Sequence, residues 1–224
     1  MVAERLVNRR GAGVISFIMF RIDSQHSFAP PNQGPDWYAK ILARNKFAGS
    51  VYVPHEGSIA DALSLAAGHS SIRRVVPRVD PDQLAEVPAH PLITSVHLSE
   101  PVPEALAELQ RRGLALEVDA SHWPFEVGEL PVALAGMCAG TGLPANVYVK
   151  LLGFRIPATP EQAQQLRQLL RHPGPERLMF ASGWPYGGGT WKETLAAFTQ
   201  SLGAMPIELR EQLLGGKARE FYRL

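Results

Sequence analysis

Short apolar runs alternate with helical patterns along most of this chain. Seven runs read as strands, at residues 20–24, 49–54, 72–79, 93–98, 114–118, 146–151 and 177–182. Helical patterns separate them, at residues 36–45, 59–67, 103–112, 160–171, 191–202 and 207–214, and a short helix is expected after residue 79. Strands that alternate with helices indicate βαβ units and a parallel sheet. The strands are apolar almost throughout, which is typical of a sheet covered on both faces.

Two α/β architectures fit this alternation, a closed (β/α) barrel and an open doubly wound sheet. No G-x-G-x-x-G motif follows the first strand, which disfavours a dinucleotide-binding sheet. The chain has 224 residues and contains no repeat or linker, so we expect a single barrel domain over residues 20–224. We expect a loosely ordered extension over residues 1–19, because its apolar run at 14–20 is too short to span a membrane and no cleavage motif follows.

Charge and cysteine content narrow the possible partners. The 22 basic and 21 acidic residues give a net charge of +1 without a basic stripe. We therefore expect neither a nucleic-acid nor a membrane partner. The single cysteine, Cys138, excludes an internal disulfide and fits a reducing, cytoplasmic location.

Four motifs resemble one known family. They are IDSQHSF at residues 22–28, NVYVKLLG at 146–153, RLMFASGWP at 177–185 and GGKAREFYRL at 215–224. The sequence resembles the amidohydrolase-related (amidohydrolase-2) family, and NVYVKLLG is similar to its lactonase-like branch of sugar and pyrone-dicarboxylate lactonases. The resemblance implies a TIM-barrel-like (β/α) fold with the active site at the carboxyl ends of the strands. With only seven clear strands, the barrel is expected to be incomplete.

The chain departs from the family at the residues that bind metal. Gln25 and Ser27 stand where the family has two histidines, and Gly183 stands where it has an aspartate. By strand alternation, His26 between them should point away from the barrel interior unless the strand is bulged. The segment between residues 122 and 146 lacks the family's D-H-x-G-x-P strand, which suggests the loss of one β/α unit. Glutamine and serine are poor ligands for transition metals, so we expect no metal site and no cofactor.

Polar side chains remain near the ends of the expected strands. A histidine near a carboxylate can act as a general acid–base pair, and a lysine can face an anionic substrate. The candidate catalytic residues are His97, Asp119, His122 and Lys150. The candidate substrate-binding residues are Gln25, Ser27, His55, Ser182, Trp184 and Tyr186. Structural roles remain open for several of them: a barrel salt bridge for Lys150, a helix cap for Asp119 or His55, and loop packing for the two aromatic residues.

The resemblance implies a hydrolase of lactonase type that acts on a small ring-containing acid or lactone by metal-independent acid–base chemistry. One alternative is a catalytically inactive barrel that binds a small molecule or a partner subunit. Another is a non-hydrolytic lyase or cyclase. A barrel that lacks one unit exposes a sheet edge, so we expect a homodimer or pairing with a related subunit.

Overall fold

The computed structural model describes residues 21–27, 34–55, 57–98, 102–119, 146–151, 160–171, 174–183 and 190–224. All strand pairs in it are parallel and form two sheets, one of β1-β2-β3 and one of β4-β5-β6-β7-β8. The strands are β1 (Arg21–His26), β2 (Phe47–Tyr52), β3 (Ile72–Val75), β4 (Arg78–Val79), β5 (Ser95–Leu98), β6 (Ala115–Asp119), β7 (Val147–Leu151) and β8 (Leu178–Phe180). The expected extension at residues 1–19 lies outside the described residues and stays a prediction.

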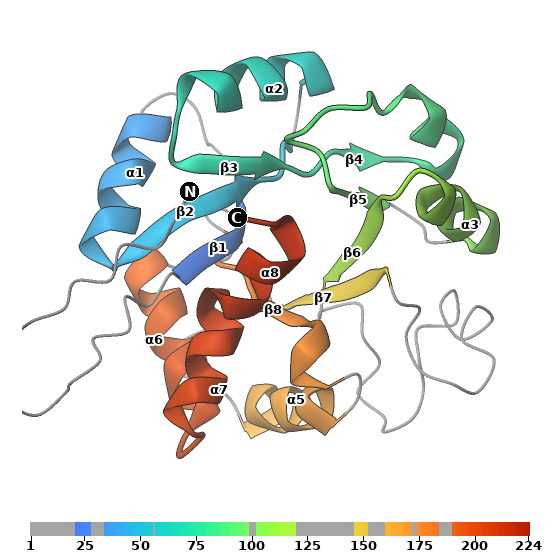
Figure 1. The fold of residues 1–224 in the computed structure, drawn as a ribbon. Helices are drawn as coiled ribbons and strands as arrows, with labels where there is room; N and C mark the ends of the chain where they lie inside the picture. The colour runs from blue at the N-terminus through green and yellow to red at the C-terminus, as the bar shows by residue number, and fades with distance from the viewer. Residues whose placement is uncertain are drawn as a thin grey trace, which may run out of the picture.

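The helices surround these strands (Figure 1). They are α1 (Pro35–Arg44), α2 (Ile59–Gly68), α3 (Pro103–Arg111), α5 (Pro160–Arg171), α6 (Trp191–Leu202), α7 (Ile207–Glu211) and α8 (Lys217–Tyr222), with 3₁₀ turns η1 (Pro81–Glu86) and η3 (Pro175–Arg177) and a π turn η4 (Gln212–Gly216). Capping boxes fix the first residues of two helices. Ser58 is the N-cap of α2 and Thr190 is the N-cap of α6. None of the helices in the described part of the chain has the length and hydropathy of a membrane span.

The two sheets are parts of one barrel wall. β3 and β4 lie in a single run that Pro77 interrupts, because proline has no N–H to give to the ladder. The run still bridges its neighbours: the Val76 N–H donates to the Tyr52 carbonyl (2.9 Å) and the His97 N–H donates to the Pro77 carbonyl (2.9 Å). The first and last strands also meet, since the Ser24 hydroxyl donates to the Phe180 carbonyl (2.5 Å). The single strand expected at residues 72–79 is therefore two short strands, β3 and β4, which follow one another in the barrel wall.

β6 and β7 are direct neighbours in this wall. Their register pairs Leu116 with Val147 and continues in steps of one residue to Asp119 with Lys150. No strand lies between them, although residues 120–145, which connect them, are outside the described part of the chain. With β3 and β4 counted as one run, the described wall has the seven strand positions that the sequence predicted.

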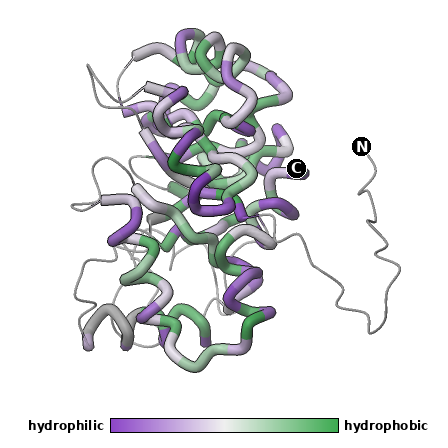
Figure 2. The backbone as a smooth tube through the Cα atoms, turned by 90° about the vertical axis from the view of Figure 1, so that its left-hand side faces the viewer, coloured by the Kyte–Doolittle hydropathy of each residue, from purple (hydrophilic) through white to green (hydrophobic). Residues whose placement is uncertain are grey.

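The strands carry different residues on their two faces. The larger apolar cluster packs between the strands and the helices and includes Val96, Leu116 and Val149 with Leu106 and Leu109 of α3. A smaller cluster faces the barrel interior, here called the lumen. It consists of Ile22, Val51, Val53, Val76, Met179, Ala218 and Tyr222. Figure 2 shows hydrophobic and hydrophilic stretches alternating along the tube, as expected for helices that bury one face.

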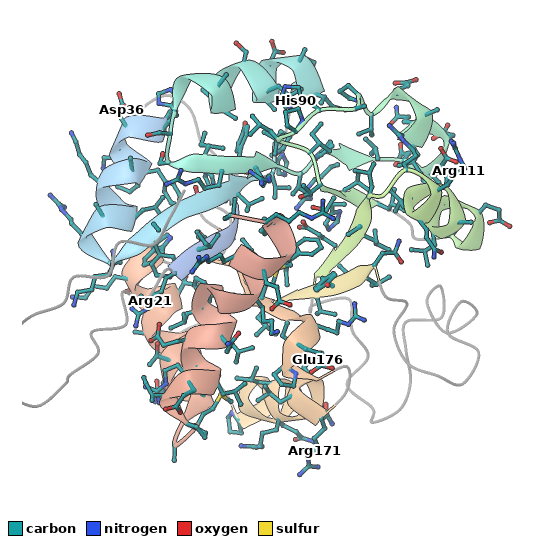
Figure 3. The ribbon with its side chains drawn as sticks, viewed as in Figure 1. Arg21, Asp36, His90, Arg111, Arg171 and Glu176 are labelled. Atoms are coloured by element: carbon teal, nitrogen blue, oxygen red, sulfur yellow. The ribbon has the colours of Figure 1, made fainter. Side chains whose placement is uncertain are left out.

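The C-terminal helices close the amino-terminal end of the barrel. Arg21, the first residue of β1, donates two hydrogen bonds to Glu211 of α7 (2.9 and 2.6 Å) and points toward these helices (Figure 3). α8 lies in the middle of the ring of strands in Figure 1, and its Tyr222 is fully buried in the lumenal cluster. The helix expected at residues 207–214 is formed by α7 and the π turn that continues it, and the kink at Gly215 separates this helical segment from α8.

Candidate functional site

The structure places five of the candidate site residues at the carboxyl ends of strands. His97 is in β5, Lys150 is in β7, and Ser27, His55 and Ser182 follow β1, β2 and β8. The backbones of Gln25 and Asp119 are in β1 and β6, but their side chains lie outside the described part of the structure. His122, Trp184 and Tyr186 lie wholly outside it, so their proposed roles stay predictions.

A buried ion pair at Lys150 joins the neighbouring strands β6 and β7 on their lumenal side. Its ammonium group contacts the carboxylate of Glu117 in β6, and neither side chain is exposed to solvent. Glu117 also accepts hydrogen bonds from the hydroxyl of Ser95 and from that of Tyr222 (2.7 Å). Burial, and then the charge of Glu117, raise the pKa of Tyr222 well above its usual value, so this phenol stays a hydrogen-bond donor. The barrel salt bridge considered for Lys150 is therefore present.

His97 lies in the same lumenal layer. Its strand neighbours Val96 and Leu98 pack in the helix-facing cluster, so the imidazole lies on the opposite, lumenal face and is 6% exposed. In the strand register, His97 is paired with Glu117 on one side and with Arg78 of β4 on the other. Paired residues in parallel strands share a face, so Arg78, His97 and Glu117 form one lumenal row.

The sequence interpretation missed two members of this row. Arg78 follows Val76, a lumenal residue, at a spacing of two, and Val79 beside it faces the helices. Glu117 lies between Leu116 and Val118, which also face the helices. Strand alternation alone could have placed both charged side chains in the lumen.

A second polar network joins β1 to β8 on the helix side. The buried carboxylate of Asp23 accepts hydrogen bonds from the Ser182 N–H (2.8 Å), the Ser182 hydroxyl (2.5 Å), the Tyr38 hydroxyl and the Trp191 indole (3.3 Å). Burial, and then the charge of Asp23, raise the pKa of Tyr38 well above its usual value. The Ser182 hydroxyl thus holds the two strands together, and its proposed contact with substrate stays a prediction. In the sequence, Asp23 stands out only as part of the IDSQHSF motif.

His26 packs against the helix layer. A β-bulge lies between Asp23 and His26, because these two residues pair with Ser50 and Tyr52, which are only two apart. The His26 ring stacks on Tyr38 of α1 (ring centroids 4.3 Å apart) and bonds the Val51 carbonyl through Nδ1 (2.9 Å). Burial, against the opposing effect of this hydrogen bond, lowers the pKa of His26 to about 3, so the imidazole is neutral. His26 points away from the lumen, as expected, but the bulge is what places it there, because unbroken alternation from the lumenal Ile22 would turn it inward.

At the positions where the resemblance places metal ligands, the described residues offer no free ligand atom to a metal ion. The Ser27 hydroxyl donates to the Val53 carbonyl, and His26 is directed into the helix layer. Gly183 has no side chain, and its left-handed backbone (φ 62°) is one that glycine adopts without strain. Within the described ranges, no three His, Cys, Asp or Glu side chains are grouped as a metal site would require.

The amidohydrolase sequence model matches residues 3–224, so the chain belongs to the amidohydrolase family. No curated protein matches the chain. Solved structures share its fold at low identity. An amidohydrolase from Burkholderia multivorans with bound zinc is 20% identical, with a TM-score of 0.67 over 92% of this chain and 99% of that one.

Two other solved structures carry different activities in their names. A protein from Pseudomonas putida named as a 2-pyrone-4,6-dicarboxylic acid hydrolase is 19% identical, with a TM-score of 0.59 over 92% of this chain and 98% of that one. A dihydroxybenzoic acid decarboxylase from Polaromonas sp. JS666, with bound manganese and an inhibitor, is 10% identical, with a TM-score of 0.53 over 92% of this chain and 97% of that one. At these identities, the similarity establishes the barrel fold alone.

Proposed function

We propose that this member of the amidohydrolase family is a lactonase-type hydrolase that acts on a small ring-containing acid or lactone without a metal ion. The observation that carries the proposal is the placement of His97 in one lumenal row with Glu117, whose carboxylate contacts Lys150. An imidazole beside a fixed charge pair, at the carboxyl ends of barrel strands, can perform acid–base chemistry. The solved relative from Pseudomonas putida, named for a pyrone-dicarboxylate hydrolase, supports a cyclic ester as substrate.

In the proposed reaction, His97 takes a proton from water as the water oxygen attacks the ring carbonyl. The ring C–O bond then breaks, and His97 returns the proton to the leaving oxygen. The Lys150 ammonium group, once Glu117 releases it, stabilises the negative charge that develops on the carbonyl oxygen. Asp119, whose backbone is in register with Lys150, and His122 complete the proposed catalytic set.

One observation favours a second candidate, a barrel that binds a small molecule without catalysis. Several polar groups at the strand ends are occupied by partners within the protein: Lys150 by Glu117, Ser27 by the Val53 carbonyl, and Ser182 by Asp23. Such groups are available to a substrate only if their internal partners release them. The two candidates differ in turnover rather than in binding.

The test is hydrolysis of 2-pyrone-4,6-dicarboxylate, followed by loss of ring absorbance. We expect turnover by the natural protein and a fall in kcat of about 100-fold or more for His97→Gln, because general acid–base catalysis contributes at least that factor. His69→Gln is the matched control, since His69 follows α2 and pairs with Asp36 on the outside of the barrel (3.5 Å). Equal turnover by natural protein and His97→Gln would refute the assigned role, and tight binding without turnover would favour the second candidate.

A further inference from the structure

Arg78 occupies a lumenal position that the proposed chemistry does not use. It begins the two-residue strand β4 and is paired in register with His97. The hydrogen bond from the His97 N–H to the Pro77 carbonyl (2.9 Å) fixes this register. Because the next residue, Val79, packs in the helix-facing cluster, Arg78 extends from the lumenal side of the wall beside His97.

The charge of Arg78 is not neutralised by the described part of the protein. Lys150, the other lumenal cation near this layer, is fully buried against Glu117. Arg78 is exposed, and no described residue forms an ion pair or hydrogen bond with its guanidinium group. The described lumenal row therefore presents a positive group to solvent beside a histidine, close to the carboxyl ends of β4 and β5.

A guanidinium group offers paired N–H donors in a planar fork that matches the two oxygens of a carboxylate. The neighbouring imidazole of His97 is the group that the proposed reaction uses. A carboxylate bound at Arg78 would thus fix the distance between the reacting ring and His97, as orientation in a productive geometry requires.

We propose that Arg78 forms the carboxylate-binding subsite of this barrel and selects ring-containing acids over neutral rings. This inference rests on the proposed function in one respect: the ring that carries the carboxylate is the one that His97 acts on. The binding role itself requires no turnover. Arg78 is accordingly a specificity-determining residue rather than a group that exchanges protons.

The test measures calorimetric binding of two probes, 2-pyrone-4,6-dicarboxylate and uncharged 2-pyrone. We expect the natural protein to prefer the dicarboxylate. Arg78→Gln should weaken dicarboxylate binding by about 10- to 100-fold, the usual loss for a charge-assisted hydrogen-bonded pair, and should leave 2-pyrone binding nearly unchanged. Arg78→Lys keeps the charge but loses the planar fork of donors, so its affinity for the dicarboxylate should lie between those of the natural protein and Arg78→Gln.

Arg73→Gln is the matched control, because it removes the same charge from the exposed amino-terminal end of the same strand run. Its dicarboxylate affinity should equal that of the natural protein. The subsite is refuted if Arg78→Gln binds the dicarboxylate as the natural protein does, if Arg73→Gln loses as much, or if the natural protein binds neither probe. Binding that depends on Arg78 but is not followed by turnover would support the subsite and refute the proposed hydrolysis. Turnover that Arg78→Gln leaves unchanged would support the hydrolysis and refute the subsite.

Discussion

The two faces of the barrel strands carry different chemistry on the same backbone. In β6 and β7, the side chains that face the helices are aliphatic, among them Leu116, Val149 and Leu151. The lumenal side chains of the same strands include Glu117 and Lys150. In these two strands, the helix side can be stable by apolar burial alone, whereas the lumenal side is stable only while its charges are paired. The helix-facing residues of β6 and β7 therefore contribute to the fold alone, whereas the lumenal charges affect stability and, in the proposed reaction, function.

The largest effect is expected from breaking the lumenal ion pair. Glu117→Ala leaves the ammonium of Lys150 buried without its partner, so the free energy of unfolding should fall by about 4 kcal/mol. The double variant Glu117→Leu/Lys150→Met removes both charges and should recover most of this loss. Urea denaturation measures both. A loss below about 1 kcal/mol for the single variant would show that Lys150 reaches solvent and is not a buried charge.

A smaller loss is expected on the helix side of the same strand. Leu151 is fully buried next to Lys150 in sequence, and Leu151→Ala should lower the free energy of unfolding by about 3 kcal/mol through lost contacts and the cavity left behind. Unlike the loss in Glu117→Ala, this loss leaves no charge without a partner, so removing a second side chain should not restore stability. Dicarboxylate affinity should be unchanged in the folded variant. A loss of affinity comparable to that of Arg78→Gln would mean that the two faces are not independent.

The smallest effect concerns the neutral histidine on the helix side. The pKa of His26 is about 3 in the folded protein and near 6.5 when unfolded, so the unfolded chain binds more protons between these values. Stability is therefore fully present above pH 6.5 and falls by about 1.4 kcal/mol for each pH unit below it, until the folded-state pKa is reached. His26→Gln keeps a donor for the Val51 carbonyl and should flatten this slope, whereas His90→Gln should not. An unchanged slope for His26→Gln would contradict the buried, neutral imidazole.

The sequence predicted the barrel better than the site, and the reason is physical. Strand runs such as residues 146–151 were recognised because apolar side chains repeat locally, and burial in a parallel sheet requires that pattern. The partners of polar residues depend on contacts between distant segments. Glu117 meets Tyr222 across 105 residues, and Asp23 meets Ser182 across 159. No local sequence pattern predicts contacts over such separations. The hydrogen bonds that join β1 to the end of β8 and the lumenal ion pair are therefore visible only in the structure.

We propose that lumenal acid–base groups, rather than a metal ion, perform the reaction. The most direct measurement combines elemental mass spectrometry of the tag-free protein with its turnover of 2-pyrone-4,6-dicarboxylate before and after treatment with a chelator. We predict substoichiometric metal and the same rate before and after treatment, with the rate abolished by His97→Gln. Stoichiometric zinc or manganese that the chelator removes together with turnover would contradict the claim.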